Sequence, residues 1–153
     1  MCIRDRVFGE DSRNPEAKGA QNVMTVCSDD GMDEFSTSAT NKVCLLKDGN
    51  TVMHSINPED VGLHMSTLGD IQVKSRKDAL ASFAGVLNGT ACRAMIETTA
   101  LNAAGGLIVG DAAKDFKDGV ELALGTIDGG KAFGLLERFV ADTGDVSKLR
   151  ELV

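Results

Sequence analysis

Short apolar runs occupy the first part of this chain, and longer stretches with helical periodicity occupy the rest. The run NVMTVCS at residues 22–28 is apolar and β-branched, which predicts a buried strand of a parallel sheet. Two further runs, residues 42–47 and 51–56, flank the turn sequence DGN. This spacing predicts a β-hairpin beside the first strand.

Apolar residues three and four positions apart predict helices over most of the chain after residue 75. Ser75 and Asp78 have the spacing of an amino-terminal capping box, and Asn88-Gly89 marks the end of the first helix. Gly105-Gly106 lies inside the second helix and lowers its propensity by roughly 1 kcal/mol per glycine, which close contact with a neighbouring helix would explain. The predicted helices cover residues 76–87, 90–109, 114–127 and 131–142, followed by a short helical tail, and residues 65–75 are expected to be irregular.

These elements predict an α/β protein. We expect a partial large domain with a few mostly parallel strands, one hairpin and a helical carboxyl-terminal half. The helices at 76–87 and 91–109 should cover the strand at 22–27. Residues 20–153 are assigned to this domain. Residues 1–19 lack a clear apolar face and are expected to be a loop, a frayed helical remnant or a disordered segment outside this domain.

The composition is that of an ordinary globular domain. The chain has 153 residues, of which 42% are hydrophobic and 25% charged, and its net charge is −7. A negative charge argues against binding to nucleic acid or to an anionic membrane. No apolar run reaches the ~20 residues that a membrane span needs, and the opening MCIRDR lacks the apolar segment of a signal peptide. Four widely spaced cysteines indicate reduced thiols, so we expect a cytoplasmic protein.

An acidic segment, CSDDGMDEFS at residues 27–36, follows the first predicted strand directly. Four carboxylates fall within six residues, and such close like charges repel. One interpretation is a solvated turn, since Asp and Gly are common turn residues. The other is a magnesium site, because Mg²⁺ uses one or two carboxylates and leaves positions for water and phosphate. Open α/β sheets place ligand sites after the carboxyl ends of strands, as here.

Several motifs, taken in order, resemble the anthranilate phosphoribosyltransferase family. VMTVCSDDGMDEFSTSATNKVCLLKDG resembles a strand, an acidic loop reading roughly H-G-x-D-G-L-D-E-x-S, and a hairpin with T-K-V-x-x-L-K-D-G. The likeness continues through INPEDVGL, LNAAGGLIVG and FKDGVELALGTIDGGKAFGLLERFV. It covers about residues 20–143 with family-like spacing.

The resemblance implies a specific reaction and metal site. The family transfers phosphoribosyl from phosphoribosyl pyrophosphate (PRPP) to the amine of anthranilate in tryptophan biosynthesis, as a homodimer. In that family the acids of the D-G-L-D-E motif bind the Mg²⁺ that neutralises the departing pyrophosphate. The matching residues here are Asp33 and Glu34. Ser36 matches a family serine with no assigned role. Asp29 is expected to be exposed and dispensable.

Two motifs of the family's earlier half, G-T-G-G-D for the pyrophosphate and K-H-G-N near the ribose, do not occur in this chain. We therefore expect the chain to be the carboxyl-terminal part of a larger enzyme and inactive by itself. No catalytic residue is assigned within it. Two alternatives stay open: an enzyme like the pyrimidine nucleoside phosphorylases, and a non-catalytic binding module of the same fold.

Overall fold

A computed structural model describes residues 22–152, so the segment at residues 1–19 lies outside the described part. The described residues form a three-stranded sheet of β1 (Val23–Ser28), β2 (Asn41–Lys47) and β3 (Asn50–Ile56). The helical elements, in chain order, are the 3₁₀ turns η3 (Pro58–Val61) and η4 (Leu68–Ile71) and the helices α2 (Arg76–Leu87), α3 (Arg93–Val109), α4 (Phe116–Asp128), α5 (Lys131–Thr143) and α6 (Val146–Arg150).

The predicted hairpin is confirmed and closes through a two-residue turn. Asp48 and Gly49 have φ angles of 51° and 76°, and Lys47 pairs with Asn50 across the turn. Positive φ at both central residues matches the right-handed twist of the strands, and Asp-Gly tolerates it well. The local sequence therefore determines the register of β2 and β3.

Strand direction differs from the expectation. β1 pairs with β2 in antiparallel fashion, from Val23 opposite Leu46 to Ser28 opposite Asn41, and β2 pairs with β3 in the same way. The prediction of mostly parallel strands is therefore wrong for this sheet. The connection of residues 29–40 contains no crossover helix of the kind that joins parallel strands. Most of β1 is also half-buried rather than covered on both faces.

The predicted helices are confirmed, with small shifts at their ends. Ser75 accepts a hydrogen bond of 3.1 Å from the amide of Asp78, as the capping spacing indicated. The stretch expected to be irregular, 65–75, contains the short turn η4. There Asp70 accepts hydrogen bonds from the amide and hydroxyl of Thr67 at 2.8 and 2.7 Å. A local capping box thus orders a segment that has no apolar periodicity.

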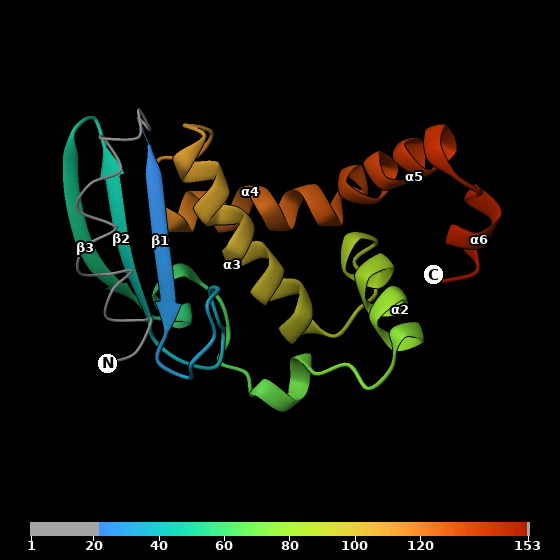
Figure 1. Ribbon diagram of the computed structural model, residues 1–153, viewed down its shortest axis with the longest axis horizontal. Helices are drawn as coiled ribbons and strands as arrows, with labels where there is room; N and C mark the ends of the chain where they lie inside the picture. The colour runs from blue at the N-terminus through green and yellow to red at the C-terminus, as the bar shows by residue number, and fades with distance from the viewer. Residues whose placement is uncertain (1–21, 153) are drawn as a thin grey trace.

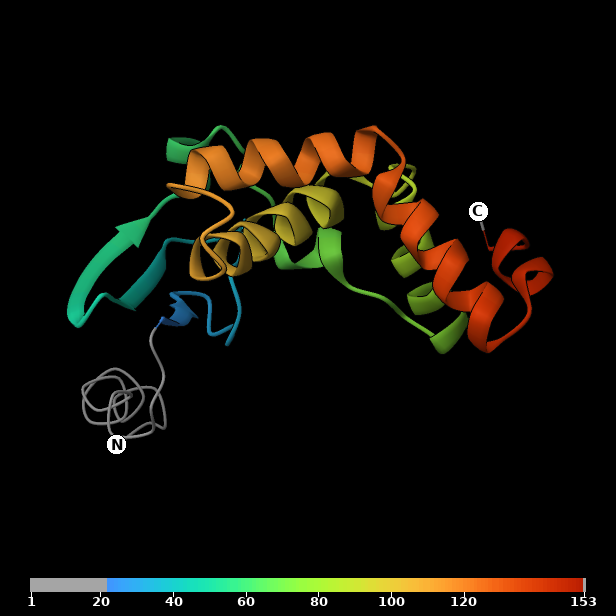
Figure 2. The same cartoon turned by 90° about the horizontal axis from the view of Figure 1, so that it is seen from above.

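The sheet stands at one end of the molecule and α3 runs from it toward the other end (Figure 1). Figure 2 shows α3 and α4 lying side by side, with α5 continuing away from the sheet. α3 contacts β1 as expected, but α2 packs against α3 and α5 at the far end and does not cover the strand. Helical periodicity identifies a face to bury without identifying its partner. In the described part of the chain, no helix is both long and apolar enough to cross a membrane.

The two adjacent glycines of α3 have different surroundings. A Cβ atom at Gly105 would lie 2.8 Å from the ring of Phe35 and 3.3 Å from the sulfur of Met24. At Gly106 it would meet no atom within 4 Å. The expected helix contact is therefore wrong for this pair, because Gly105 makes room for β1 and the β1–β2 loop. The close helix contact lies elsewhere, at Gly119 of α4, whose added Cβ would be 2.8 Å from that of Ala104.

Candidate functional site

The acidic segment forms a tight turn at the end of β1. The Ser28 amide donates to the carbonyl of Met32 at 3.0 Å, and the Gly31 amide donates to the carbonyl of Ser28 at 3.1 Å. Gly31 has φ +97°, a conformation that residues with a side chain rarely adopt. The turn is followed directly by Asp33 and Glu34, and both of these acids are exposed.

Asp29 and Asp30 are engaged within the protein. Asp29 forms an ion pair of 2.7 Å with Lys42 of the neighbouring strand, and its side chain is 42% exposed. Asp30 is half-buried and accepts hydrogen bonds from the hydroxyls of Ser36 and Ser38, both at 2.6 Å, and from the Met32 amide at 3.1 Å. These contacts fold the segment onto itself. They also give Ser36, which had no assigned role, a structural one.

The surroundings of Asp30 favour its charged form. Partial burial, the largest single influence, raises the pKa of this carboxyl. The hydrogen bonds from Ser36, Ser38 and the Met32 amide, with a smaller contribution from Ser28, together outweigh it and lower the pKa to about 2. Asp30 is therefore ionised at neutral pH, and its oxygens are already occupied by protein donors.

Asp33 and Glu34 are the acids that remain available. Both are exposed, and neither carboxylate forms a hydrogen bond or ion pair with any residue of the described range 22–152. Both line a groove of about 470 Å³ between β1 and α3, which Met24, Asn102 and Gly106 also line. The four like charges are therefore divided. Asp29 faces a lysine, Asp30 faces two serines, and Asp33 and Glu34 face the groove.

These two carboxylates suit a magnesium ion that brings further ligands with it. Hard oxygen donors are the ligands Mg²⁺ prefers, and it commonly takes one or two carboxylates together with water and phosphate oxygens. Within residues 22–152, no group of three or more His, Cys, Asp or Glu side chains could hold a metal by itself. The donor set therefore fits a metal shared with a phosphorylated ligand better than a closed structural site.

Two asparagines that sequence analysis did not single out hold the backbone next to these acids. Asn102 of α3 binds both the amide and the carbonyl of Phe35, and Asn41 of β2 binds both those of Ser36. Asn102 lies 67 residues from its partner, and no local pattern marks such a contact. The motif LNAAGGLIVG contains it, but its spacing indicated only a helix.

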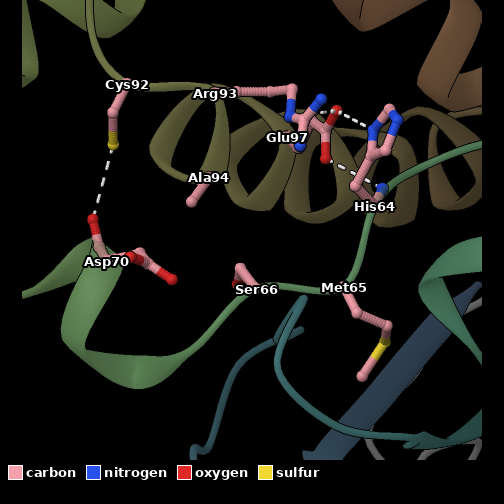
Figure 3. Close-up of a pocket in the computed structure, with 8 residues that line it drawn as sticks. All are labelled: His64, Met65, Ser66, Asp70, Cys92, Arg93, Ala94 and Glu97. Atoms are coloured by element: carbon pink, nitrogen blue, oxygen red, sulfur yellow. Dashed lines mark hydrogen bonds and ion pairs between the residues drawn. The ribbon is translucent and has the colours of Figure 1, made fainter.

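A second pocket, of about 320 Å³, lies at the amino-terminal end of α3 and is built differently (Figure 3). The buried carboxylate of Glu97 accepts hydrogen bonds from the backbone amide of His64 at 2.9 Å and from its ring Nδ1 at 2.8 Å. The Arg93 guanidinium lies 3.7 Å away, and the Cys92 thiol donates to the carbonyl of Asp70 at 3.4 Å. Both oxygens of Glu97 are thus engaged. The cluster fastens the segment that follows η3 to α3.

The fold is that of a family of glycosyl transferases. Residues 16–133 match the profile of the glycosyl transferase family, a/b domain, and the chain belongs to this family. The anthranilate phosphoribosyltransferase of Nitrosopumilus maritimus is 66% identical over 135 residues, which make up 88% of this chain and 39% of that protein. That of Cenarchaeum symbiosum is 42% identical over 97% of this chain and 46% of its own length. The chain thus spans less than half of these relatives.

Solved structures lead to the same fold. The crystal structure of anthranilate phosphoribosyltransferase from Thermus thermophilus aligns with a TM-score of 0.72 and 27% identity, over 88% of this chain and 37% of that one. The enzyme from Saccharomyces cerevisiae in complex with PRPP and Mg aligns with a TM-score of 0.66 over 82% of this chain and 35% of that one. At 22% identity, the yeast structure supports the fold alone.

Proposed function

We propose that this chain is the carboxyl-terminal part of an anthranilate phosphoribosyltransferase, and that it supplies the metal-binding side of the pyrophosphate site. The observation that carries the proposal is the pair of Asp33 and Glu34, exposed toward a groove and without partners among the described residues. The names of the relatives support the reaction. We further propose a cytoplasmic, homodimeric full-length enzyme. None of the reported relatives favours a nucleoside phosphorylase.

In the proposed reaction, the amine nitrogen of anthranilate forms a bond to the anomeric carbon of the ribose. The bond from that carbon to the pyrophosphate oxygen breaks, and the nitrogen loses a proton. The bound metal supplies neutralisation of the negative charge that builds on the leaving group. Asp33 and Glu34 would hold this metal through their carboxylate oxygens. Asp30 does not compete for it, because two serine hydroxyls donate to its Oδ2 and the Met32 amide donates to its Oδ1.

Other parts of the reaction centre belong to the portion of the full-length enzyme outside this chain. A groove lined by two acids can hold one side of a metal–pyrophosphate complex, but among the described residues that line it none has a cationic side chain to face the phosphates. Holding two substrates in line supplies several kcal/mol of barrier reduction. We propose that the remainder of the polypeptide holds the anthranilate and the opposite face of the pyrophosphate.

The test is steady-state turnover of the full-length enzyme that contains this chain, followed by the loss of anthranilate fluorescence. Asp33→Asn and Glu34→Gln preserve shape and remove charge. If they remove roughly 3 kcal/mol of leaving-group stabilisation, turnover falls about a hundredfold. The melting temperature should not fall, because neither side chain has a protein partner to lose within the described range.

Asp29→Asn is the matched control, since it lies in the same segment and removes the same charge. Its ion pair with Lys42 is on the surface, where such pairs contribute about 0–1 kcal/mol, and turnover should stay close to that of the wild type. Normal, magnesium-dependent turnover in an Asp33→Asn, Glu34→Gln double variant would overturn the assignment.

A further inference from the structure

Two consecutive residues after the candidate metal ligands have their backbones bound by side-chain amides. The Phe35 amide donates to Oδ1 of Asn102 at 3.0 Å, and Nδ2 of Asn102 donates to the Phe35 carbonyl at 2.8 Å. The Ser36 amide donates to Oδ1 of Asn41 at 2.8 Å, and Nδ2 of Asn41 donates to the Ser36 carbonyl at 2.9 Å. Each asparagine thus satisfies both backbone groups of one residue.

These hydrogen bonds resemble those of a β-strand that lies between two neighbouring strands. In an antiparallel ladder, a residue exchanges both its N–H and its C=O with one neighbour, and the next residue faces the other way. Here Asn102 of α3 and Asn41 of β2 take the places of the two neighbouring strands. The chain leaving Glu34 is therefore held between a helix and the sheet, with no ladder of its own.

The asparagines are themselves held in place. Nδ2 of Asn102 also donates to the carbonyl of Thr98, one helical turn earlier, at 2.9 Å. Nδ2 of Asn41 also donates to the carbonyl of Ala39 at 3.2 Å, and the Asn41 side chain is fully buried. In each case the donor and acceptor pattern is consistent with only one amide orientation.

The side chain of Phe35 also attaches this segment to the helices. Its ring is 3% exposed and stacks edge-on against Phe116 with centroids 5.2 Å apart. Gly105 makes room for it, one turn of α3 beyond Asn102. Ring and backbone together bind Phe35 to α3, and Glu34 precedes Phe35 by a single peptide bond. Little freedom is left for the Glu34 backbone.

We propose that Asn102, with Asn41, is a positioning residue that sets the direction in which Asp33 and Glu34 project into the β1–α3 groove. This inference rests on the proposed function, because it concerns the same metal site. The two carboxylates are exposed and have no hydrogen-bond or ion-pair partner within residues 22–152, so we infer that the backbone supplies that direction. Side chains that orient metal ligands from outside commonly change metal affinity or activity about 10–100-fold when they are removed.

The experiment compares Asn102→Leu with Val120→Ala in the full-length enzyme. Leucine keeps the approximate volume of Asn102 and removes all of its hydrogen bonds. Val120 of α4 is 2% exposed and belongs to the same hydrophobic core as Phe35, but its side chain has no hydrogen-bonding group, so its truncation lowers stability by packing alone. Asn102→Ala serves as a second variant, since the smaller side chain lets water reach the Phe35 backbone if the leucine variant does not fold.

Three quantities are measured: the melting temperature, the calorimetric affinity for PRPP with saturating Mg²⁺ and with EDTA, and amide hydrogen exchange over residues 31–37. We expect both Asn102 variants to bind PRPP about tenfold more weakly with Mg²⁺, to be unchanged in EDTA, and to exchange faster over residues 31–37. Val120→Ala should lower the melting temperature and change neither of the other two.

The outcomes separate this inference from the proposed function. If wild-type binding of PRPP does not depend on Mg²⁺, the proposed function is overturned and this inference falls with it. If the wild type depends on Mg²⁺ but the Asn102 variants lose no more Mg²⁺-dependent affinity than Val120→Ala, the positioning role alone is overturned. In that case Asn102 contributes only to stability.

Discussion

Replacing Gly105 by alanine places a methyl group 2.8 Å from the ring of Phe35, whereas the same change at Gly106 meets nothing within 4 Å. Both changes gain the same helix propensity, about 1 kcal/mol, since both glycines lie inside α3. The difference between the two variants therefore isolates the cost of the clash.

The size of that cost follows from what the methyl group would touch. The nearest atom belongs to an aromatic ring that is 3% exposed and packed against Phe116, so it cannot swing away as the end of an exposed side chain would. Forcing an extra methyl group into such a site costs about 1–3 kcal/mol. The Gly106→Ala variant should be more stable than the wild type by about 1 kcal/mol. The Gly105→Ala variant should be less stable than the Gly106→Ala variant by about 1–3 kcal/mol.

Urea unfolding, monitored by circular dichroism, gives the free energy of unfolding of both variants and of the wild type under the same conditions. The second readout is turnover of the full-length enzyme. Phe35 adjoins Glu34, so Gly105→Ala should also reduce activity. Equal stability of the two variants would refute the reasoning, because it would mean that Phe35 can move at no cost.

Two further predictions concern the acidic segment and the chain by itself. Asp30 has its pKa lowered to about 2, so its stabilising contribution is present above about pH 4 and is lost as the pH falls through 2. Through the linkage of proton binding to folding, this pKa shift corresponds to about 2 kcal/mol of folding stability. Solvent screening of a half-buried group reduces that contribution to about 1 kcal/mol. Asp30→Asn should be less stable by that amount at pH 7 and show a flatter stability profile between pH 4 and 2; an unchanged profile would contradict the assignment. The isolated 153-residue chain, given Mg²⁺, PRPP and anthranilate, should show no loss of anthranilate fluorescence above the control without protein, and steady turnover would show that the chain holds both substrates unaided.

Local signals in the sequence predicted the elements well. The Ser75 cap, the Asp48-Gly49 turn and Asn88-Gly89 each lie at an element boundary in the structure. Each acts through its own backbone or through a neighbour three residues away, so a short stretch of sequence contains the whole cause. The acidic segment was also located in advance, because it directly follows the apolar run of β1.

Contacts between distant residues account for the features that sequence analysis missed. An apolar run shows that a strand is buried but not the direction of its partner, and β1 runs antiparallel to β2. The contact of Gly105 with Phe35 and the hydrogen bonds of Asn102 join α3 to a loop about 70 residues earlier. Which acids stay available likewise depends on where Lys42, Ser36 and Ser38 come to lie, and spacing does not determine that.

The central claim is that Asp33 and Glu34 bind the metal that accompanies the pyrophosphate, and its most direct test is a calorimetric titration of the full-length enzyme with PRPP, with saturating Mg²⁺ and with EDTA. The wild type and Asp29→Asn should bind PRPP about tenfold or more tightly with Mg²⁺, as expected for two ligands coupled at one site. The Asp33→Asn, Glu34→Gln double variant should bind PRPP equally weakly in both conditions. A double variant that keeps the full Mg²⁺-dependent gain would contradict the account, because the metal would then be held by other residues.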